Sequence, residues 1–235
     1  MTDRKSSMNS RSDLDQEWVL YDYYRSSAAF RVRIVLNYKN LKAMSSHVSL
    51  IDNGGEQFSE AYTNINPQQL IPSLQMGDFQ LTQSLAIIEY LEERYPTPAI
   101  LPGTANERAI IRAFSYSISC DIHPLNNLRV QKYLVNELQC SNEQKEQWVR
   151  EWIHRGFIAL ETQLNSQASS VSSDYCFSTF SLADVCLIPQ IYNAKRFEVD
   201  MSAFPKLENI YRQCSQLDFV NNASPEVVEK SLSNP

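Results

Sequence analysis

Glycine is scarce in this chain, and the scarcity excludes two large groups of nucleotide-binding proteins. Only five of the 235 residues are glycine, whereas average usage of about 7% would supply roughly sixteen. The phosphate loop of P-loop enzymes and the dinucleotide fingerprint both need several closely spaced glycines, and no such cluster occurs here. We therefore expect neither kind of nucleotide-binding fold.

Positive charge is also in deficit. The chain has 21 Lys and Arg against 27 Asp and Glu, a net charge of -6 at pH 7. Proteins that bind nucleic acid neutralise its phosphates with a surplus of Lys and Arg. Nucleic acid is therefore not an expected partner.

The sulfur and imidazole side chains form no recognisable metal or redox motif. The five cysteines are odd in number and include no Cys-x-x-Cys pair; they are Cys120, Cys140, Cys176, Cys186 and Cys214. Buried free thiols in a reducing compartment are the simplest account. The three histidines are too scattered for a His-x-x-x-His site, so no metal is expected.

Long apolar runs are missing as well. The first sixteen residues contain no apolar core of a signal peptide, and no later stretch approaches the roughly 18 apolar residues of a membrane span. We expect a cytoplasmic protein that does not bind membranes.

The first half of the chain contains alternating strand and helix patterns. In chain order, the sequence predicts a strand over 18–24, a helix over 28–41, a strand over 47–51, a short helix or turn over 56–65, a hairpin of 71–76 and 79–81 around Gly77-Asp78, and a helix over 84–95. Pro72 at the head of a strand is compatible with a cis peptide bond. The order is βαβαββα.

The second half contains long helical patterns and few strand signals. The predicted helical segments are 105–139, 142–164, 182–194 and 206–217, with a polar linker at 166–173. Ser181 and Asp184 have the spacing of a capping box before an apolar helix. An α/β unit is therefore expected to precede an all-helical one.

A specific motif lies at the first strand-to-helix turn. Residues 20–36 read LYDYYRSSAAFRVRIVL. This segment resembles the signature of zeta-class glutathione transferases, an aromatic strand followed by Arg-Ser-Ser-Cys-x-aromatic-Arg-Val-Arg-Ile. Further matching segments are 56–59, 66–67, 83–93, 123–128, 183–187 and 193–197, so the resemblance covers about 18–220. The family it implies is the maleylacetoacetate isomerases, glutathione-dependent enzymes of tyrosine and phenylalanine breakdown, with the related maleylpyruvate isomerases.

The resemblance implies a fold, a cofactor and an assembly. It implies a glutathione transferase fold, with a thioredoxin-like α/β domain over 17–97 that binds glutathione, a linker over 98–104 and an all-helical substrate domain over 105–235. Residues 1–16 form a polar tail that we expect to be disordered. The family forms homodimers, so a homodimer is expected here.

The catalytic role in this resemblance falls on the two serines of the motif. Ser27, with Ser26 beside it, would donate a hydrogen bond to the glutathione thiolate at the start of a helix and lower the pKa of its thiol. A simple helix cap is the alternative. Tyr21, Tyr23 and Tyr24 are rival thiolate stabilisers, although alternation along a strand places most of them in the core.

The remaining glutathione contacts follow residue by residue from the resemblance. Gln57 would reach the glycyl carboxylate, Ile71 would pair through its backbone with the cysteinyl part, Gln83 and Ser84 would hold the γ-glutamyl carboxylate at a helix start, and His123 and Asn127 would face the cleft from a helix of the second domain. Related enzymes often have glutamine in place of His123, which leaves the role of His123 open.

Arginines are the expected partners of a dicarboxylate substrate. Arg196 matches the substrate arginine of the family and can grip a carboxylate through two parallel hydrogen bonds, with Arg25 nearby. A surface ion pair of Arg196 with Glu198 or Asp200 is the alternative.

The motif contains two further arginines and an alanine in place of a cysteine. Arg31 and Arg33 are expected to be structural or to lie at the rim of the cleft. Ala28 replaces the cysteine of the family motif. The reaction does not need that cysteine, because glutathione itself supplies the nucleophilic sulfur.

The implied reaction is the glutathione-dependent cis-to-trans isomerisation of maleylacetoacetate to fumarylacetoacetate. Alternatives are a maleylpyruvate isomerase, a general glutathione transferase or dehalogenase, and a non-catalytic interaction module. The joint presence of Ser27, Gln83, Ser84 and Arg196 argues against the last, since a scaffold has no physical need for a glutathione site.

Overall fold

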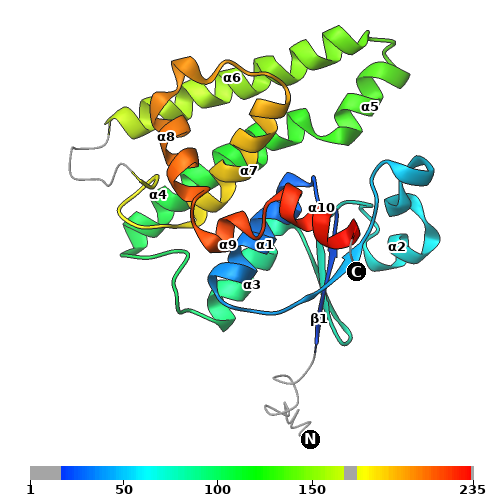
Figure 1. The fold of residues 1–235 in the computed structure, drawn as a ribbon, viewed down its shortest axis with the longest axis horizontal. Coiled ribbons are helices and arrows are strands. Elements are labelled where there is room, and N and C mark those ends of the chain that lie inside the picture. Colours follow the sequence, from blue (N-terminus) through cyan, green and yellow to red (C-terminus); the bar gives the residue numbers. More distant parts are fainter. Residues whose placement is uncertain (1–16, 167–173, 234–235) are drawn as a thin grey trace, which may run out of the picture.

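The computed structural model describes residues 17–166 and 174–233. The predicted tail at 1–16 lies outside these residues, as does the predicted linker at 166–173 except Ser166, which ends a helix. The chain forms a small α/β part and a larger helical part that lie against each other (Figure 1). The predicted boundary at 98–104 falls between the last helix of the first part and the first helix of the second.

A mixed four-stranded sheet forms the centre of the first part. Its strands are β1 (Trp18–Asp22), β2 (Met44–His47), β3 (Ser73–Met76) and β4 (Phe79–Thr82), in the spatial order β2-β1-β3-β4. β1 and β2 are parallel, whereas β3 is antiparallel to both β1 and β4. The predicted hairpin turn at Gly77-Asp78 is confirmed.

The predicted position of the second strand is wrong. The sequence pattern places this strand over 47–51, but the parallel register pairs Val19 with Met44 and Asp22 with His47, so the strand ends where the prediction begins. β2 is an edge strand whose residues are exposed or half-buried. Its sequence therefore lacks the apolar alternation that a half-buried strand shows.

Three helices accompany the sheet: α1 (Ser27–Tyr38), α2 (Glu60–Ile65) and α3 (Ser84–Arg94). Ser26 is the N-cap of α1, because its hydroxyl oxygen accepts a hydrogen bond from the Ala29 N–H at 3.2 Å. The Ile71-Pro72 peptide bond is cis, as Pro72 at the head of a strand allows.

The helical part begins with an interrupted segment. The pattern over 105–139 predicts continuous helix, but the structure has α4 (Ala105–Tyr116), a π-helical turn (Ser117–Ile122), a 3-10 turn (His123–Asn126) and α5 (Leu128–Asn136). Pro124 lies inside the interruption, where it cannot donate a helical hydrogen bond. The chain continues as α6 (Asn142–Ser166), α7 (Leu182–Arg196), a 3-10 turn (Met201–Ala203), α8 (Pro205–Cys214), α9 (Asp218–Asn221) and α10 (Pro225–Ser233).

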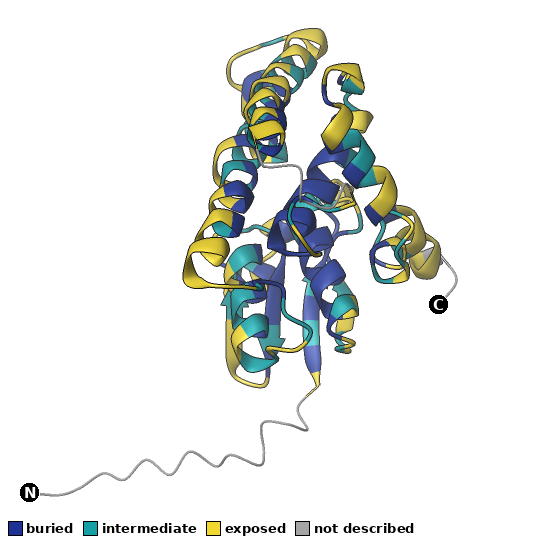
Figure 2. Cartoon of the chain, turned by 90° about the vertical axis from the view of Figure 1, so that its left-hand side faces the viewer, coloured by how far each residue is buried: buried dark blue, intermediate teal, exposed yellow. Residues whose placement is uncertain are grey.

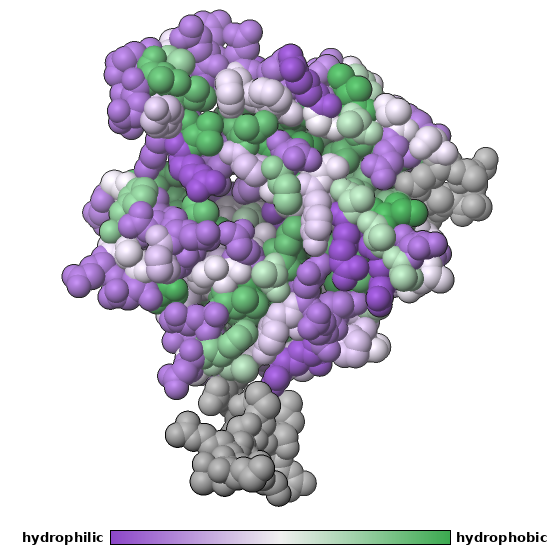
Figure 3. Space-filling view, turned by 180° about the vertical axis from the view of Figure 1, so that it is seen from behind, coloured by the Kyte–Doolittle hydropathy of each residue, from purple (hydrophilic) through white to green (hydrophobic). Residues whose placement is uncertain are grey.

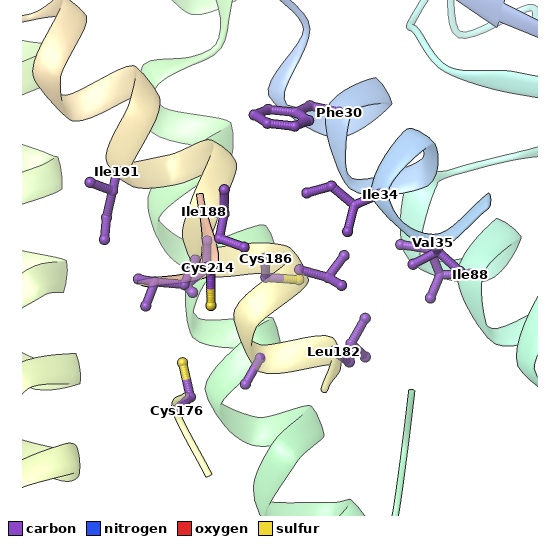
Figure 4. Close-up of a cluster of buried hydrophobic side chains, with 14 of the residues drawn as sticks. Phe30, Ile34, Val35, Ile88, Cys176, Leu182, Cys186, Ile188, Ile191 and Cys214 are labelled. Carbon is purple, nitrogen blue, oxygen red and sulfur yellow. The ribbon is translucent and has the colours of Figure 1, made fainter. Parts of the chain in front are cut away.

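α7 is the central helix of the molecule. Most of its residues are buried, and side chains of α1 and α7 point toward one another in the core (Figure 4). Buried residues concentrate where the two parts meet, and exposed residues lie on the outer helices (Figure 2). The predicted capping box is confirmed, since the Asp184 carboxylate accepts from the Ser181 N–H at 2.9 Å.

The cysteines are all free, but they differ in burial. Cys176, Cys186 and Cys214 are buried, Cys140 is half-buried and Cys120 is exposed. The expectation of buried thiols is therefore wrong for Cys120, which lies on the π-helical turn. No helix among the described residues has the length and apolar character needed to cross a membrane.

Candidate active site

Two adjoining chambers form one cleft between the α/β part and the helical part. The first chamber has a volume of about 360 Å³ and the second about 430 Å³. Residues that line both chambers are Gln68, Leu70, Ile71, His123, Asn127 and Arg129. Seen from behind, the surface mixes hydrophilic and hydrophobic residues and is hollowed between the upper and lower parts (Figure 3).

The structure brings all the site residues expected from the sequence into this cleft. Ser26, Ser27, Arg25, Gln57 and Arg196 line the first chamber, Gln83 and Ser84 line the second, and Ile71, His123 and Asn127 line both. Ala28 lies on the wall of the second chamber. These residues are far apart in sequence, so the fold assembles them.

The two serines differ in how their hydroxyl groups are used. The Ser26 oxygen accepts from the Ala29 N–H, which leaves the Ser26 hydroxyl proton available to a ligand. The Ser27 hydroxyl lies 3.4 Å from the Pro189 carbonyl oxygen on α7, an acceptor that competes with any ligand for its proton. Both serines lie at the start of α1, where backbone N–H groups favour an anion.

The start of α3 forms the polar end of the second chamber. Gln83 precedes the helix with φ of 70°, a left-handed conformation, and its amide donates to Gln68 Oε1 at 2.7 Å. Ser84 is the first helical residue, and its hydroxyl oxygen accepts from Arg31 Nη1 at 3.4 Å. The first turn of α3 contains no acidic residue, so no carboxylate within this turn is available to its backbone N–H groups.

Gln57 is buried at the other end of the cleft, in the first chamber. Its Oε1 atom has no hydrogen-bond partner in the part of the chain that the structure describes. Gly55 makes room for this side chain: φ at Gly55 is 117°, and a Cβ there would lie 2.7 Å from the Gln57 amide. The positive φ favours glycine, and a side chain here would displace the amide of Gln57.

Ile71 lies between the two ends. Its neighbour Leu70 is fixed by hydrogen bonds to the Leu70 carbonyl from Tyr62 Oη and Asn66 Nδ2, both at 2.7 Å. These contacts hold the segment before cis Pro72 in place and direct it along the junction of the chambers.

His123 and Asn127 do not lie within a regular helix, contrary to the expectation from the sequence. His123 begins the 3-10 turn and Asn127 is the N-cap of α5. The Nδ1 atom of His123 is buried and has no hydrogen-bond partner among the residues that the structure describes. Burial, together with the positive charges of Arg31 and Arg129, lowers the pKa of His123 to about 3, so the ring is neutral near pH 7.

The first chamber is lined by four cations and no acidic residue. They are Arg25, Arg129, Lys132 and Arg196, and none of them forms an ion pair among the described residues. Sequence reasoning missed Arg129 and Lys132. Both lie on α5 directly after the 123–128 segment, and this position is the signal that could have found them.

The geometry disfavours the alternatives for Arg196 and for the tyrosines. Arg196 forms no ion pair with Glu198 or Asp200 and lies 3.5 Å from Asn193 Oδ1 through Nη1. Burial raises the pKa of Tyr23, the one tyrosine of the three that lines the first chamber, to about 12. A phenol with a raised pKa is a weak donor to a thiolate.

The chain was compared with known proteins. A protein-family model described as "Glutathione S-transferase, N-terminal domain" matches residues 20–99. A probable maleylacetoacetate isomerase of Vibrio cholerae is 46% identical over 209 residues, which cover 88% of this chain and 95% of that protein.

Solved structures of maleylpyruvate and maleylacetoacetate isomerases are also similar to the chain. A holo maleylpyruvate isomerase, described as a bacterial zeta-class glutathione transferase, is similar with a TM-score of 0.85 and 38% identity, covering 89% of this chain and 97% of that one. A maleylacetoacetate isomerase from Methylobacterium extorquens, solved with bound malonate and glutathione, has a TM-score of 0.84 and 34% identity, again over 89% and 97%.

Proposed function

Because this chain belongs to the zeta class of glutathione transferases, the family of the maleylacetoacetate isomerases, we propose that it converts maleylacetoacetate to fumarylacetoacetate with glutathione as cofactor. One observation carries this proposal: the serine-bearing start of α1 faces a chamber whose rim has four cations and no carboxylate. Such a chamber suits a reaction in which an anionic sulfur meets a dianionic substrate.

The polar groups of the cleft fit the shape and charge of glutathione. Gln57 at one end has an amide nitrogen that can donate a hydrogen bond to a carboxylate, and Ser84 at the other end begins a helix whose first turn has no acidic residue. Ile71 lies between them and would pair with the peptide backbone. A short peptide with a carboxylate at each end matches this arrangement.

When bound, glutathione supplies a thiolate that adds to the cis double bond of the substrate and leaves again after rotation about that bond. Ser26 and Ser27 would hold the sulfur in its ionised form by hydrogen bonding. Arg196 and Arg25 would grip the substrate carboxylates. Backbone N–H groups at the start of α1 would stabilise the negative charge that develops on the substrate carbonyl oxygen.

Maleylpyruvate is the main alternative substrate, and a general transferase is the main alternative activity. We would measure turnover with maleylacetoacetate, maleylpyruvate and an uncharged aryl halide, for the wild-type protein and Arg196→Ala. The proposal predicts that Arg196→Ala raises KM for the two dicarboxylates about tenfold or more and leaves KM for the aryl halide nearly unchanged. Faster turnover of the aryl halide than of either dicarboxylate would contradict it.

We also propose that two copies associate through α4. Ile110 and Tyr116 of this helix are large exposed apolar side chains, and Ala109 and Ala113 are exposed beside them. A helix face of this kind is typical of a subunit interface. The free state of all five thiols supports a reducing compartment such as the cytoplasm.

A further inference from the structure

Arg31 is a buried cation without an acidic partner. Its side chain, on α1, is 1% exposed, and among the described residues its only hydrogen bond runs from Nη1 to the Ser84 oxygen at 3.4 Å. Within residues 17–166 and 174–233, the Nε and Nη2 atoms have no hydrogen-bond partner. Arg33, two residues later, is also buried, but it pairs with Asp22 at 2.6 Å and donates to the carbonyl oxygens of Ala223 and Tyr24.

The surroundings of Arg31 do not neutralise its charge. The Arg31 guanidinium interacts electrostatically with the thiols of Cys186 and Cys120. The nearby imidazole of His123 is neutral. Burial of an unpaired charge is strongly unfavourable, and proteins retain one where a ligand or a reaction needs it. The burial of Arg31 is therefore inconsistent with a place at the rim of the cleft, and its unpartnered nitrogens set it apart from Arg33.

The position of Arg31 indicates what neutralises it. Arg31 lines the second chamber together with Gln83 and Ser84, behind the first turn of α3. Because Arg31 donates to the Ser84 oxygen, the Ser84 hydroxyl proton is directed to another acceptor. An anion at this point would meet the Ser84 hydroxyl, the N–H groups of α3 and the charge of Arg31 together.

We propose that Arg31 is the positioning residue and counter-cation for a carboxylate bound at the start of α3, and that this carboxylate is the α-carboxylate of the γ-glutamyl residue. This assignment rests on the proposed use of glutathione. It implies that the ligand-free protein bears the cost of an unpaired buried charge and that binding of the carboxylate relieves it. Arg31 therefore acts through Ser84 and its charge, without a place in the chemical step.

The test compares Arg31→Met with the matched control Arg33→Met. Replacement of an unpaired buried charge by an apolar side chain of similar length is often neutral or stabilising, whereas removal of one partner of a buried pair is destabilising. We expect Arg31→Met to leave the melting temperature of the ligand-free protein equal or higher. Arg33→Met should lower it, because Asp22 is left unpaired.

Calorimetric titration provides the second readout, with glutathione and two analogues. One analogue, 4-aminobutyryl-cysteinylglycine, lacks the α-carboxylate; the other, γ-glutamyl-cysteine ethylamide, lacks the glycyl carboxylate. Hydrogen bonds to charged groups correspond to a loss of about tenfold to a hundredfold in affinity. Arg31→Met should show this loss for glutathione and the ethylamide, and less than about a twofold change for the analogue without the α-carboxylate.

Two results would overturn the inference. One is equal loss for all three ligands with a melting temperature as low as that of Arg33→Met, which would make Arg31 structural. The other is unchanged glutathione affinity in Arg31→Met. A wild-type protein that binds glutathione but isomerises neither dicarboxylate would overturn the proposed reaction and leave the Arg31 comparison intact; one that does not bind glutathione would overturn both.

Discussion

At the scale of single residues, two neighbouring serines divide the work at the start of α1. Ser26 caps the helix through its oxygen and keeps its proton available, whereas Ser27 lies beside the Pro189 carbonyl. The sequence motif identifies the pair, but it cannot tell them apart, because the difference depends on α7, more than 150 residues later.

Ser26→Ala should therefore impair catalysis more than Ser27→Ala. We expect kcat/KM to fall on the order of a hundredfold for Ser26→Ala, as for loss of one donor to a reacting anion, and only a few-fold for Ser27→Ala. Ser26→Ala also removes the cap, at a cost of about 1 kcal/mol in the free energy of unfolding. Ultraviolet absorbance of the bound thiolate should show the ionisation of glutathione shifted to higher pH in Ser26→Ala. The reverse order of the two variants would contradict the assignment.

His123 should act as a neutral side chain. Because its pKa is lowered to about 3 by burial and by Arg31 and Arg129, His123→Gln should leave the pH dependence of kcat/KM unchanged between about pH 5.5 and 7.5. Steady-state rates across this range test the expectation. An inflection near the ordinary histidine pKa in the wild-type protein that disappears in His123→Gln would show instead that the ring titrates during turnover.

The burial of Arg31 and its lack of an acidic partner among the described residues could not be predicted from the sequence. Amphipathic spacing places Arg31 on α1, but its burial depends on α3 and on the turn that contains His123, which pack against it only in the folded chain. Nothing local in the sequence distinguishes it from Arg33, which has a carboxylate partner. The motif therefore locates the cleft, and the packing decides the role of each arginine.

At the scale of elements, the most accurate predictions rest on local chemistry. The capping box of Ser181 and Asp184 and the turn at Gly77-Asp78 depend on a few adjacent residues, and both are found as predicted. The predicted position of β2 is wrong, and the helical segment predicted over 105–139 is interrupted by a π-helical and a 3-10 turn. An edge strand is defined by its pairing partner, and the π-helical turn before Pro124 has no apolar signature of its own.

The capping box also predicts a pH dependence of stability. Burial raises the pKa of Asp184 to about 6 in the folded protein, despite hydrogen bonds from Cys176 and Ser181 that lower it. Between about pH 4 and 6 the folded chain then binds this proton more tightly than the unfolded chain, so the free energy of unfolding falls as pH rises.

We test this with Asp184→Asn, which cannot titrate. The stability of the wild-type protein relative to this variant should fall by on the order of 2 kcal/mol from about pH 4 to pH 6.5, with little change above. Urea unfolding of both proteins at each pH provides the measurement, and effects of other groups cancel in the difference. A relative stability that rises with pH would contradict the raised pKa.

At the scale of the whole molecule, the charge that lines the cleft is opposite in sign to the net charge of the chain. The chain has a net charge of -6, yet four cations without acidic neighbours line the first chamber. Such a cleft concentrates anions despite the overall charge. The composition predicts little affinity for polyanions, but it cannot reveal a local cationic site that only the fold assembles.

Association through α4 can be tested with two matched isoleucines. Ile110 on α4 is 49% exposed and Ile158 on α6 is 50% exposed. A buried unpaired charge disrupts an interface, so Ile110→Glu should yield monomers in sedimentation equilibrium. Ile158→Glu should behave as the wild-type protein, for which we expect dimers. Dimers that persist in Ile110→Glu would place the interface elsewhere.

The central claim is that glutathione acts in this cleft as a cofactor that each reaction returns unchanged. The most direct measurement follows conversion of maleylacetoacetate in glutathione at a concentration far below that of the substrate, with free thiol measured in parallel. The account predicts many molecules of fumarylacetoacetate per glutathione and constant free thiol. Conversion that stops at one product per glutathione, loss of thiol to a conjugate, or an equal rate without glutathione would contradict it.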